Sequence, residues 1–167
     1  HRIDGIIVAG GRVGYQSAYE LHSSRSRYPD LDIPIVCMPM TINNDVPGTE
    51  LSIGSDTALN SIVSDVDKIR QSAVATRRVF VVEVMGRHTG WIAVMSGIAG
   101  GADVILIPEQ PITVEEACAD LVRRHEGGKD FSIVVVSEGY QLTYKSGERH
   151  LVAGAARGSD QFGHVVL

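Results

Sequence analysis

The sequence of 167 residues is poor in cysteine and in aromatic side chains. It holds two cysteines, Cys37 and Cys118, and only 5% of its residues are Phe, Trp or Tyr. No CxxC pair is present, so the pattern excludes a cysteine zinc site and a disulfide framework. We interpret both cysteines as reduced core residues, Cys37 in an apolar strand and Cys118 in a helix, and we expect a cytoplasmic protein.

An excess of positive charge and long apolar runs are also missing. Lys and Arg number 15 against 20 Asp and Glu, which gives a net charge of -5. Such a chain is not expected to bind nucleic acid or an anionic membrane, and an anionic ligand would need a local basic cluster. The apolar runs are too short to cross a bilayer, and no signal peptide is visible. The chain opens on "HRIDGIIVAGG" without Met and stops at "FGHVVL", so we expect a fragment of a longer polypeptide.

What the sequence does have is a series of strand-length segments rich in Val and Ile. They are "GIIVAGG" at 5–11, "IPIVCM" at 33–38, "RVFVVEV" at 78–84, "ADVILIP" at 102–108 and "FSIVVVSEG" at 131–139. Each is nearly continuous in apolar character, which is typical of parallel strands that are covered on both faces.

Helical patterns separate these segments. Apolar residues recur at three- and four-residue steps over 55–75, with Ser55 as a candidate cap, and "TVEE" at 113–116 is a capping box that opens a helix over 113–126. Weaker patterns cover 14–28 and 90–100, where we place Trp91 and Met95 in the core. The alternation predicts a layered α/β fold with a mainly parallel sheet and helices on both faces, and 140–161 is expected to be a hairpin or a loop.

In open parallel sheets, ligands bind beyond the carboxyl ends of the strands. The polar segments at these positions are "GGRVGY", "PMTINNDVPG", "MGRHTG", "PEQP" and "SEGYQ". The turn at Gly10 and Gly11 could offer N–H groups to a phosphate or be a plain strand-to-helix turn. Arg87 suits a phosphate but could be an ordinary surface residue, and Glu138 could accept from a sugar hydroxyl or cap a turn.

Three long segments resemble the 6-phosphofructokinase family. They are "TINNDVPGTELSIGSDTALN", "RRVFVVEVMGRHTGWIAVMSGIAGGADVILIPE" and "FSIVVVSEG". The resemblance implies two α/β domains with a cleft between them for fructose 6-phosphate and a nucleotide. Residues 1–54 would be the C-terminal part of the nucleotide-side domain, and residues 55–167 most of the sugar-phosphate-side domain.

The resemblance also implies roles for individual residues. Thr41 and Asp45 match the Thr and the second Asp of the family's "TIDND" loop. Met85, Gly86 and Arg87 match its "MGR" contact to the sugar, and Glu138 matches the Glu that holds sugar hydroxyls. Arg78 matches an Arg that reaches the sugar phosphate of a neighbouring subunit, which would explain an Arg at the amino end of a strand.

Two positions depart from the family pattern. Asn43 stands where catalytic members have the Asp base, and an amide has almost no basicity; losing a general base is worth roughly 10²–10⁴ in rate. The family's "GGDGS" turn is here Gly10, Gly11, Arg12 and Val13, so a cation replaces the Asp that would orient Mg²⁺. The resemblance implies Mg²⁺ and ATP for the family, but we expect this portion to bind neither.

These residues leave three hypotheses. The first is a regulatory portion of a 6-phosphofructokinase that binds fructose 6-phosphate or a fructose bisphosphate and tunes a partner half, as the C-terminal halves of duplicated eukaryotic members do. The second is an active kinase, dependent on ATP or pyrophosphate, with Asp45 as base; Met40 and Val13, at the positions linked to donor choice, match neither usual pattern. The third is a non-catalytic assembly module of a homo-oligomer.

Overall fold

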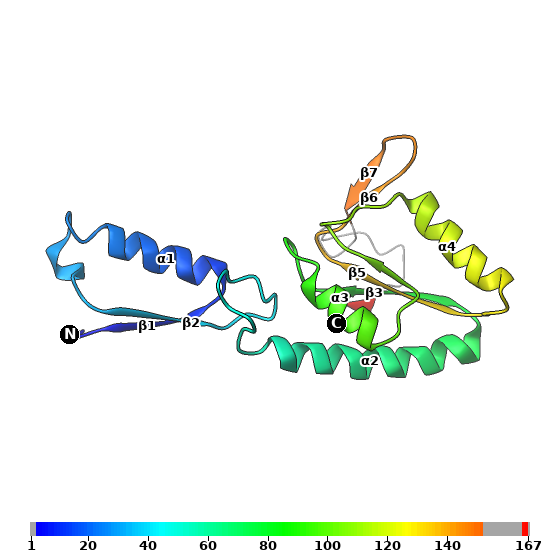
Figure 1. Cartoon of the computed structure of the whole chain (residues 1–167), viewed down its shortest axis with the longest axis horizontal. Coiled ribbons are helices and arrows are strands. Elements are labelled where there is room, and N and C mark those ends of the chain that lie inside the picture. Colours follow the sequence, from blue (N-terminus) through cyan, green and yellow to red (C-terminus); the bar gives the residue numbers. More distant parts are fainter. Residues whose placement is uncertain (1–2, 152–164, 167) are drawn as a thin grey trace. The chain divides into compact units, whose positions relative to one another are not determined.

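The first part of the chain forms a two-stranded parallel sheet with one helix. The computed structural model describes residues 3–151 and 165–166, and the chain divides into two compact units, His1–Asp56 and Thr57–Leu167. The elements of the first unit are β1 (Ile6–Gly10), α1 (Arg12–Ser23), the short 3-10 helix η1 (Pro29–Leu31) and β2 (Ile35–Pro39). β1 pairs with β2 in register from Ile6 opposite Ile35 to Gly10 opposite Pro39, and α1 lies along one face of the pair (Figure 1).

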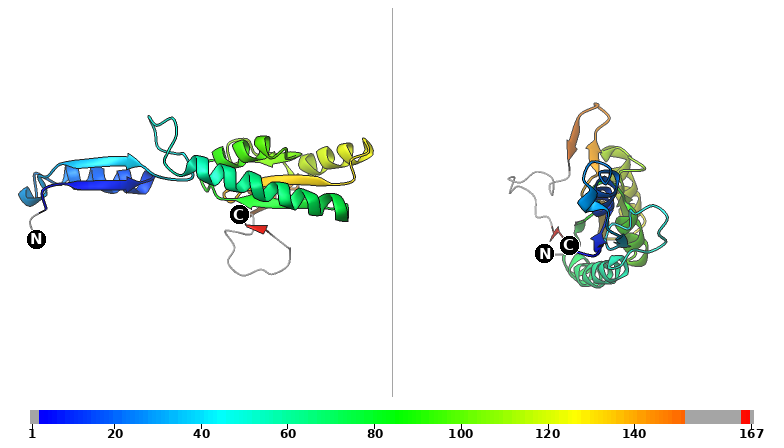
Figure 2. Two further views of the ribbon diagram at one scale, coloured as in Figure 1. Left: turned by 90° about the horizontal axis from the view of Figure 1, so that it is seen from below. Right: turned by 90° about the vertical axis from the view of Figure 1, so that its left-hand side faces the viewer.

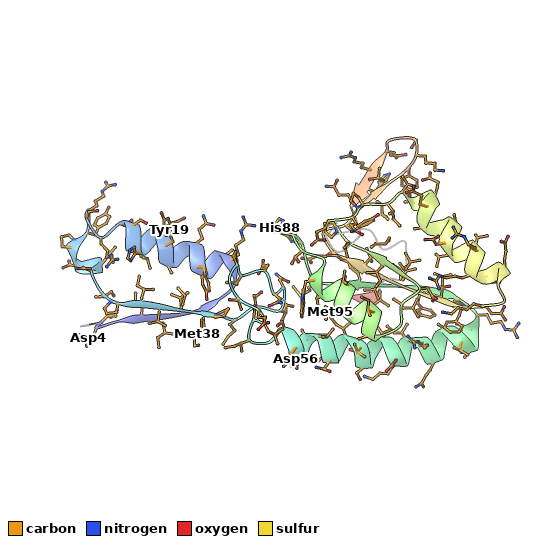
Figure 3. The ribbon with its side chains drawn as sticks, viewed as in Figure 1. Asp4, Tyr19, Met38, Asp56, His88 and Met95 are labelled. Atoms are coloured by element: carbon orange, nitrogen blue, oxygen red, sulfur yellow. The ribbon has the colours of Figure 1, made fainter. Side chains whose placement is uncertain are left out.

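The other face of this sheet is apolar and open within the unit. Ile7 is 71% exposed and Val36 57% exposed, and Met38 points away from α1 (Figure 3). Strand side chains alternate between faces, and α1 covers only the face that carries the other set. The expectation that both faces of every strand are covered is therefore wrong for β1 and β2 within the described unit.

The second unit is larger and contains a parallel sheet of four strands. Its elements are α2 (Ser55–Thr76), β3 (Val79–Val84), α3 (Trp91–Ala99), β4 (Val104–Leu106), α4 (Val114–Glu126), β5 (Ser132–Ser137), β6 (Gln141–Thr143), β7 (Arg149–Leu151) and β8 (Val165–Val166), with the start of α2 at the boundary between the units. Figure 2 shows this unit from two further sides, with the long helix α2 running along it. The strand order is β4-β5-β3-β8, and all three pairings are parallel. This confirms the predicted α/β class with a mainly parallel sheet.

β5 is the centre of the core of the second unit. All six of its residues are buried, and it lies between β3 and β4. Residues from β4 and β5 form a cluster with the buried Tyr140, whose hydroxyl accepts from the N–H of Ile112 at 3.0 Å and donates to the carbonyl of the same residue. Beyond Tyr140, β6 and β7 form an antiparallel hairpin, while residues 152–161 of the predicted hairpin or loop lie outside the described residues.

The helix ends test several sequence predictions. The capping box is confirmed: Thr113 Oγ1 accepts from the N–H of Glu116 at 3.2 Å, and Glu116 Oε2 accepts from the N–H of Thr113 at 2.7 Å. Hydrogen bonds from the backbone and side chain of Thr113 lower the pKa of Glu116. Ser55 is the first residue of α2, and its hydroxyl donates to the carbonyl of Ser52 at 2.7 Å.

Two predicted core residues are on the surface. Cys118 is exposed on α4, and Met95 on α3 is 42% exposed. Met95 stands in a helix whose apolar stripe is blurred by small residues, so the pattern gave no clear face. On α4, Ala117 and Leu121 pack against the core, and the adjacent Cys118 does not. Cys37 is half-buried in β2, as expected for a strand residue.

Candidate functional site

One group of candidate residues gathers at the carboxyl edge of the first unit's sheet. β1 and β2 end side by side, since the N–H of Met40 donates to the carbonyl of Gly10 at 3.0 Å. Gly11 lies against the side chain of Thr41, and a β-carbon at Gly11 would be 3.0 Å from Thr41 Cβ. The glycine turn and the polar loop at 40–54 are therefore direct neighbours.

The start of α1 carries a positive charge. Arg12 is its first residue, Gly11 precedes it, and the helix has neither a side-chain cap nor an acidic residue in its first turn. The first turn of a helix has a partial positive charge, which Arg12 reinforces. Val13 follows with its side chain exposed. This environment favours an anion and opposes a metal ion.

The loop after β2 is held in shape by Asn44, a residue that sequence reasoning missed. Its backbone is left-handed, with φ of 51°, a conformation that Asn tolerates better than most residues. The side-chain Oδ1 accepts from the N–H of Ser52 at 2.8 Å and from its hydroxyl at 3.1 Å, and Nδ2 donates to the carbonyl of Glu50 at 3.2 Å. Asn44 thus ties the start of the loop to its end.

Asn43 and Asp45, on either side of this clamp, present unused polar atoms. The N–H of Asn43 donates to Thr41 Oγ1 at 3.2 Å. The Oδ1 atoms of Asn43 and Asp45 are buried and have no hydrogen-bond partner within the described part of the chain. A buried polar atom without a partner costs about 1–3 kcal/mol, so its presence in two neighbouring side chains marks this loop as a candidate binding site.

The second group gathers at the carboxyl ends of β3 and β5. Val84 lies opposite Ser137 in the ladder, and the N–H of Glu138 donates to the carbonyl of Val84 at 2.9 Å. Arg87 Nε is 4.0 Å from Glu138 Oε1, with the Arg side chain 71% exposed and the Glu side chain 24% exposed. The pair is open to solvent, so both side chains have hydrogen-bonding capacity for a ligand.

The turn that carries Arg87 requires glycine at position 86. Gly86 has φ of 132°, and a β-carbon there would overlap the carbonyl oxygen of Thr89. The hydroxyl of Ser137 donates to the carbonyl of Gly86, which joins the end of β5 to the turn. Met85 is exposed just before it, and His88 lies in the same loop ahead of α3 (Figure 3). Ser137 was missed because a hydroxyl at a strand end is common and carries no motif.

Arg78 is not brought together with Arg87. It directly precedes β3, while Arg87 follows the same strand. Six strand residues span about 20 Å, so the two guanidinium groups start from opposite ends of the sheet. Arg78 is exposed, and its backbone carbonyl accepts from the N–H of Ser132.

The residues at the first unit's edge do not fit a magnesium ion. The loop there offers the carboxylate of Asp45 and the amide of Asn43, and the turn beside it carries the cation Arg12. Mg²⁺ prefers an octahedron of oxygen ligands with carboxylates among them. Across residues 3–151 and 165–166, no three His, Cys, Asp or Glu side chains gather in a way that could hold a metal ion. Among the described helices, none has the length and apolar character needed to cross a bilayer.

Fold and site together define an α/β protein with candidate binding residues beyond the carboxyl ends of two parallel sheets, the place where open α/β folds bind ligands. A family model described as Phosphofructokinase matches residues 1–164. The chain belongs to the phosphofructokinase family.

Individual relatives agree with this assignment. The chain is 47% identical over 147 residues to an ATP-dependent 6-phosphofructokinase of Bacillus licheniformis, an alignment that covers 88% of this chain and 44% of the relative. Its structure is similar to that of Pichia pastoris phosphofructokinase in the T-state, with a TM-score of 0.78, 35% identity, and coverage of 89% of this chain and 18% of that one. A pyrophosphate-dependent phosphofructokinase from Marinobacter aquaeolei matches with a TM-score of 0.70, 30% identity, and coverage of 84% and 38%. The chain spans less than half the length of each of these proteins.

Proposed function

We propose that this chain is a regulatory portion of a 6-phosphofructokinase, the enzyme that phosphorylates fructose 6-phosphate, and that it binds fructose 6-phosphate or a fructose bisphosphate without transferring a phosphoryl group. The observation that carries the proposal is Asn43. It stands at the family's base position, in a loop where its Oδ1 is buried and without a partner in the described chain. An amide there can hydrogen-bond to a sugar hydroxyl but cannot remove its proton.

The charge at Arg12 supports the same conclusion. Phosphoryl transfer depends on positioning and on metal ions that neutralise the developing charge. Arg12 at the start of α1 repels Mg²⁺, so we propose that this edge holds no Mg²⁺ ion and that ATP, whose phosphoryl transfer depends on such an ion, is not used there.

The second group of residues supplies the sugar-phosphate grip. Arg87 offers a permanently charged, forked donor, and Glu138 offers a carboxylate acceptor beside it. A phosphorylated ketose carries an anion and several hydroxyls, which match these two groups. We assign Met85 and Gly86 to the same contact, because they form the turn from which Arg87 projects.

Arg78 fits this proposal only through a second subunit. It lies at the opposite end of β3 from Arg87, so the two do not reach one sugar phosphate from the same sheet. We therefore propose a homo-oligomer, or a partner half of the same polypeptide, in which Arg78 contacts the phosphate bound by its neighbour. Arg78→Ala is then expected to weaken ligand binding only in the assembled protein.

The test is an equilibrium titration of the intact protein with fructose 6-phosphate and with fructose 1,6-bisphosphate. Arg87→Ala and Glu138→Ala should each weaken binding at least tenfold, since a charged hydrogen bond contributes about 1.5–3 kcal/mol. His88→Ala is the matched control, because its side chain is exposed in the same loop. If binding is saturable and Arg87→Ala leaves its affinity unchanged, the proposal is wrong.

A second candidate is an active kinase in which Asp45 serves as base. The observation in its favour is that Asp45 Oδ1 is also buried without a hydrogen-bond partner in the described chain, two residues from Asn43. Steady-state assays of the intact protein with ATP and with pyrophosphate decide between the two. If the protein transfers a phosphoryl group at this site and Asp45→Asn abolishes the activity, Asp45 is the base. If Asn43→Asp instead raises turnover by roughly 10²–10⁴, the natural pocket lacks its base.

A further inference from the structure

The loop between β3 and α3 is anchored at both ends by side chains from elsewhere in the second unit. At its start, the carbonyl of Gly86 accepts from the hydroxyl of Ser137. At its end, the N–H of Gly90 donates to Glu109 Oε1 at 2.7 Å. Arg87 projects from between these two anchors.

Glu109 reaches this loop from a turn that follows β4. The turn spans Ile107–Gln110, which form an isolated antiparallel bridge, and the N–H of Gln110 donates to the carbonyl of Ile107 at 3.3 Å. A short closed turn holds the backbone of Glu109, so its carboxylate approaches Gly90 from a fixed base. The contact joins residues 19 positions apart in the sequence.

The helix that begins after Gly90 depends on this outside carboxylate. α3 has no side-chain cap at Gly90 and no acidic residue in its first turn. A carboxylate at a helix start satisfies a free N–H and complements the partial positive charge there. Thr89 contributes a weaker contact, since its Oγ1 accepts from the N–H of Trp91 at 3.2 Å.

Gly90 is packed closely against the turn that carries Glu109. A β-carbon at Gly90 would overlap the side chain of Ile107 and lie 2.8 Å from Glu109 Oε2. The two turns therefore touch through the backbone of one and the side chains of the other. A contact of this kind transmits the position of the Glu109 turn to the Gly86–Gly90 loop.

The side chain of Arg87 has few contacts of its own, whereas its backbone lies directly against Gly139. Its side chain is 71% exposed, and its distance of 4.0 Å from Glu138 is at the limit of an ion pair. The position of its guanidinium is then set mainly by the backbone of the loop, which the two anchors and the contact with Gly139 define. Exposed ion pairs contribute about 0–1 kcal/mol and do not fix a long side chain.

We propose that Glu109 is a positioning residue for sugar-phosphate binding: by accepting from the N–H of Gly90, it fixes the loop that presents Arg87 beside Glu138. This inference rests on the proposed function, because it assumes that Arg87 binds the ligand phosphate. Glu109 does not touch the ligand in this role, and it acts through Arg87.

The experiment is a double-mutant cycle on the intact protein, read as the Kd for fructose 6-phosphate. Glu109→Ala should raise the Kd roughly tenfold, since displacing a binding group by about 1 Å can cost up to 10²-fold. In the Arg87→Ala background the same change should have no further effect, because the two residues act as a unit. Gln110→Ala, in the same turn, is the matched control and should leave the Kd unchanged.

Two further variants keep the test sharp if Glu109→Ala folds poorly. Glu109→Gln keeps an acceptor oxygen and should raise the Kd less than about threefold, since a neutral acceptor is roughly half as strong. Glu109→Asp keeps the charge but is one methylene shorter, so it should raise the Kd as much as Glu109→Ala does. Thermal unfolding is followed in parallel through Trp91, the one tryptophan of the sequence, which adjoins Gly90.

The outcomes separate the two proposals. If Arg87→Ala weakens binding while Glu109→Ala does not, the positioning role is overturned and the binding proposal stands. The positioning role is also overturned if Glu109→Ala lowers the affinity equally in the wild-type and Arg87→Ala backgrounds, because Glu109 then does not act through Arg87. If Glu109→Gln raises the Kd as much as Glu109→Ala does, the hydrogen bond to Gly90 is excluded as the cause, and the positioning role is overturned. If Arg87→Ala has no effect, the proposed function itself fails, and the positioning role falls with it.

Discussion

β5 of the second unit is buried along all six of its residues, whereas β2 of the first unit exposes every other side chain. Glu138 therefore follows a strand that its own unit encloses, and Arg87 follows β3, of which the last three residues are buried. The loop that carries Asn43 stands on a two-stranded sheet with one open apolar face, and it keeps its shape through the side chain of Asn44. Within one chain, the loops that carry Arg87 and Glu138 depend on packing in their own unit, and the loop that carries Asn43 depends on local hydrogen bonds.

The largest expected effect would break the scaffold of the second unit at Asp103. Its side chain is 3% exposed, accepts from the N–H of Ile133 at 3.0 Å, and pairs with Lys129 and with Arg124 at 3.3 Å. Asp103→Ala should lower the free energy of unfolding by about 2–4 kcal/mol, because a buried N–H and two cations lose their acceptor. Urea denaturation measures this.

The control for that variant is Asp65→Ala, which removes an exposed ion pair with Lys68 at 2.7 Å on α2. An exposed pair contributes less than about 1 kcal/mol. Equal losses from both variants would mean that Asp103 is hydrated in solution and does not support β5.

A matched pair of valines tests the comparison between the strands directly. Val135→Ala in β5 removes two methyl groups from a fully buried side chain and should cost about 2 kcal/mol. Val36→Ala in β2 alters a side chain that is 57% exposed and should cost less than about 0.5 kcal/mol. Hydrogen exchange of peptides covering each strand reports the local stabilities. A large cost at Val36 would mean that the open face of β2 is covered in the protein in solution.

The helix starts provide the next contrast. Thr113→Ala removes the cap of α4 and should destabilise the second unit by about 1 kcal/mol, since Thr113 Oγ1 no longer accepts from Glu116. Thr113→Ser keeps the hydroxyl and serves as the control. If Ala and Ser unfold at the same denaturant concentration, the cap contributes nothing to stability.

A substitution at the start of α1 should raise the stability of its unit, whereas Thr113→Ala lowers it at the start of α4. Arg12→Glu places a negative charge in a first turn that has no acidic residue, and it should stabilise the first unit by roughly 0.3–1 kcal/mol. Salt should reduce the gain, which separates an electrostatic cause from packing. If Arg12→Glu lowers the free energy of unfolding, the guanidinium of Arg12 has a partner whose stabilising contribution exceeds its repulsion by the helix dipole.

The smallest expected effect is a pH dependence at α4. Hydrogen bonds from Thr113 lower the pKa of Glu116 in the folded chain below its usual value of 4.5. The carboxylate therefore stabilises the fold above that value, and this contribution is lost as the pH falls through the lowered pKa. Glu116→Gln should flatten this part of the stability profile when unfolding is followed between pH 7 and pH 3. An unchanged profile would contradict the capping geometry.

The sequence predicted the strands well because each is a run of Val and Ile between turn residues. "RVFVVEV" at 78–84 became β3 at Val79–Val84, and "IPIVCM" at 33–38 became β2 at Ile35–Pro39. The capping box at Thr113 and Glu116 was predicted because both partners lie within one turn. α1 ends at Ser23, earlier than the predicted 28, because small and polar residues blur the apolar stripe there.

The sequence did not predict the contacts that hold the candidate site in shape. Asn44 bonds to residues six and eight positions away, and Glu109 to a residue 19 positions away. Such contacts depend on how loops fold back, which periodicity does not encode. The segment "PEQP" was flagged as polar sequence after a strand, yet nothing in it distinguished Glu109 from Gln110. The exposed face of β1 and β2 was missed because apolar strands look the same covered or open.

The strand order β4-β5-β3-β8 also has a consequence for how the second unit assembles. β3 and β4 follow one another along the chain, yet β5 lies between them, and its pairing joins Val79 to Ser132. A nascent chain released only as far as α4 would hold two strands with a gap and no ladder between them. Folding of this unit must wait for residues 132–137, and contacts so distant in sequence close slowly. Until β5 inserts, the edges of the apolar strands β3 and β4 lack their partner and are open to aggregation.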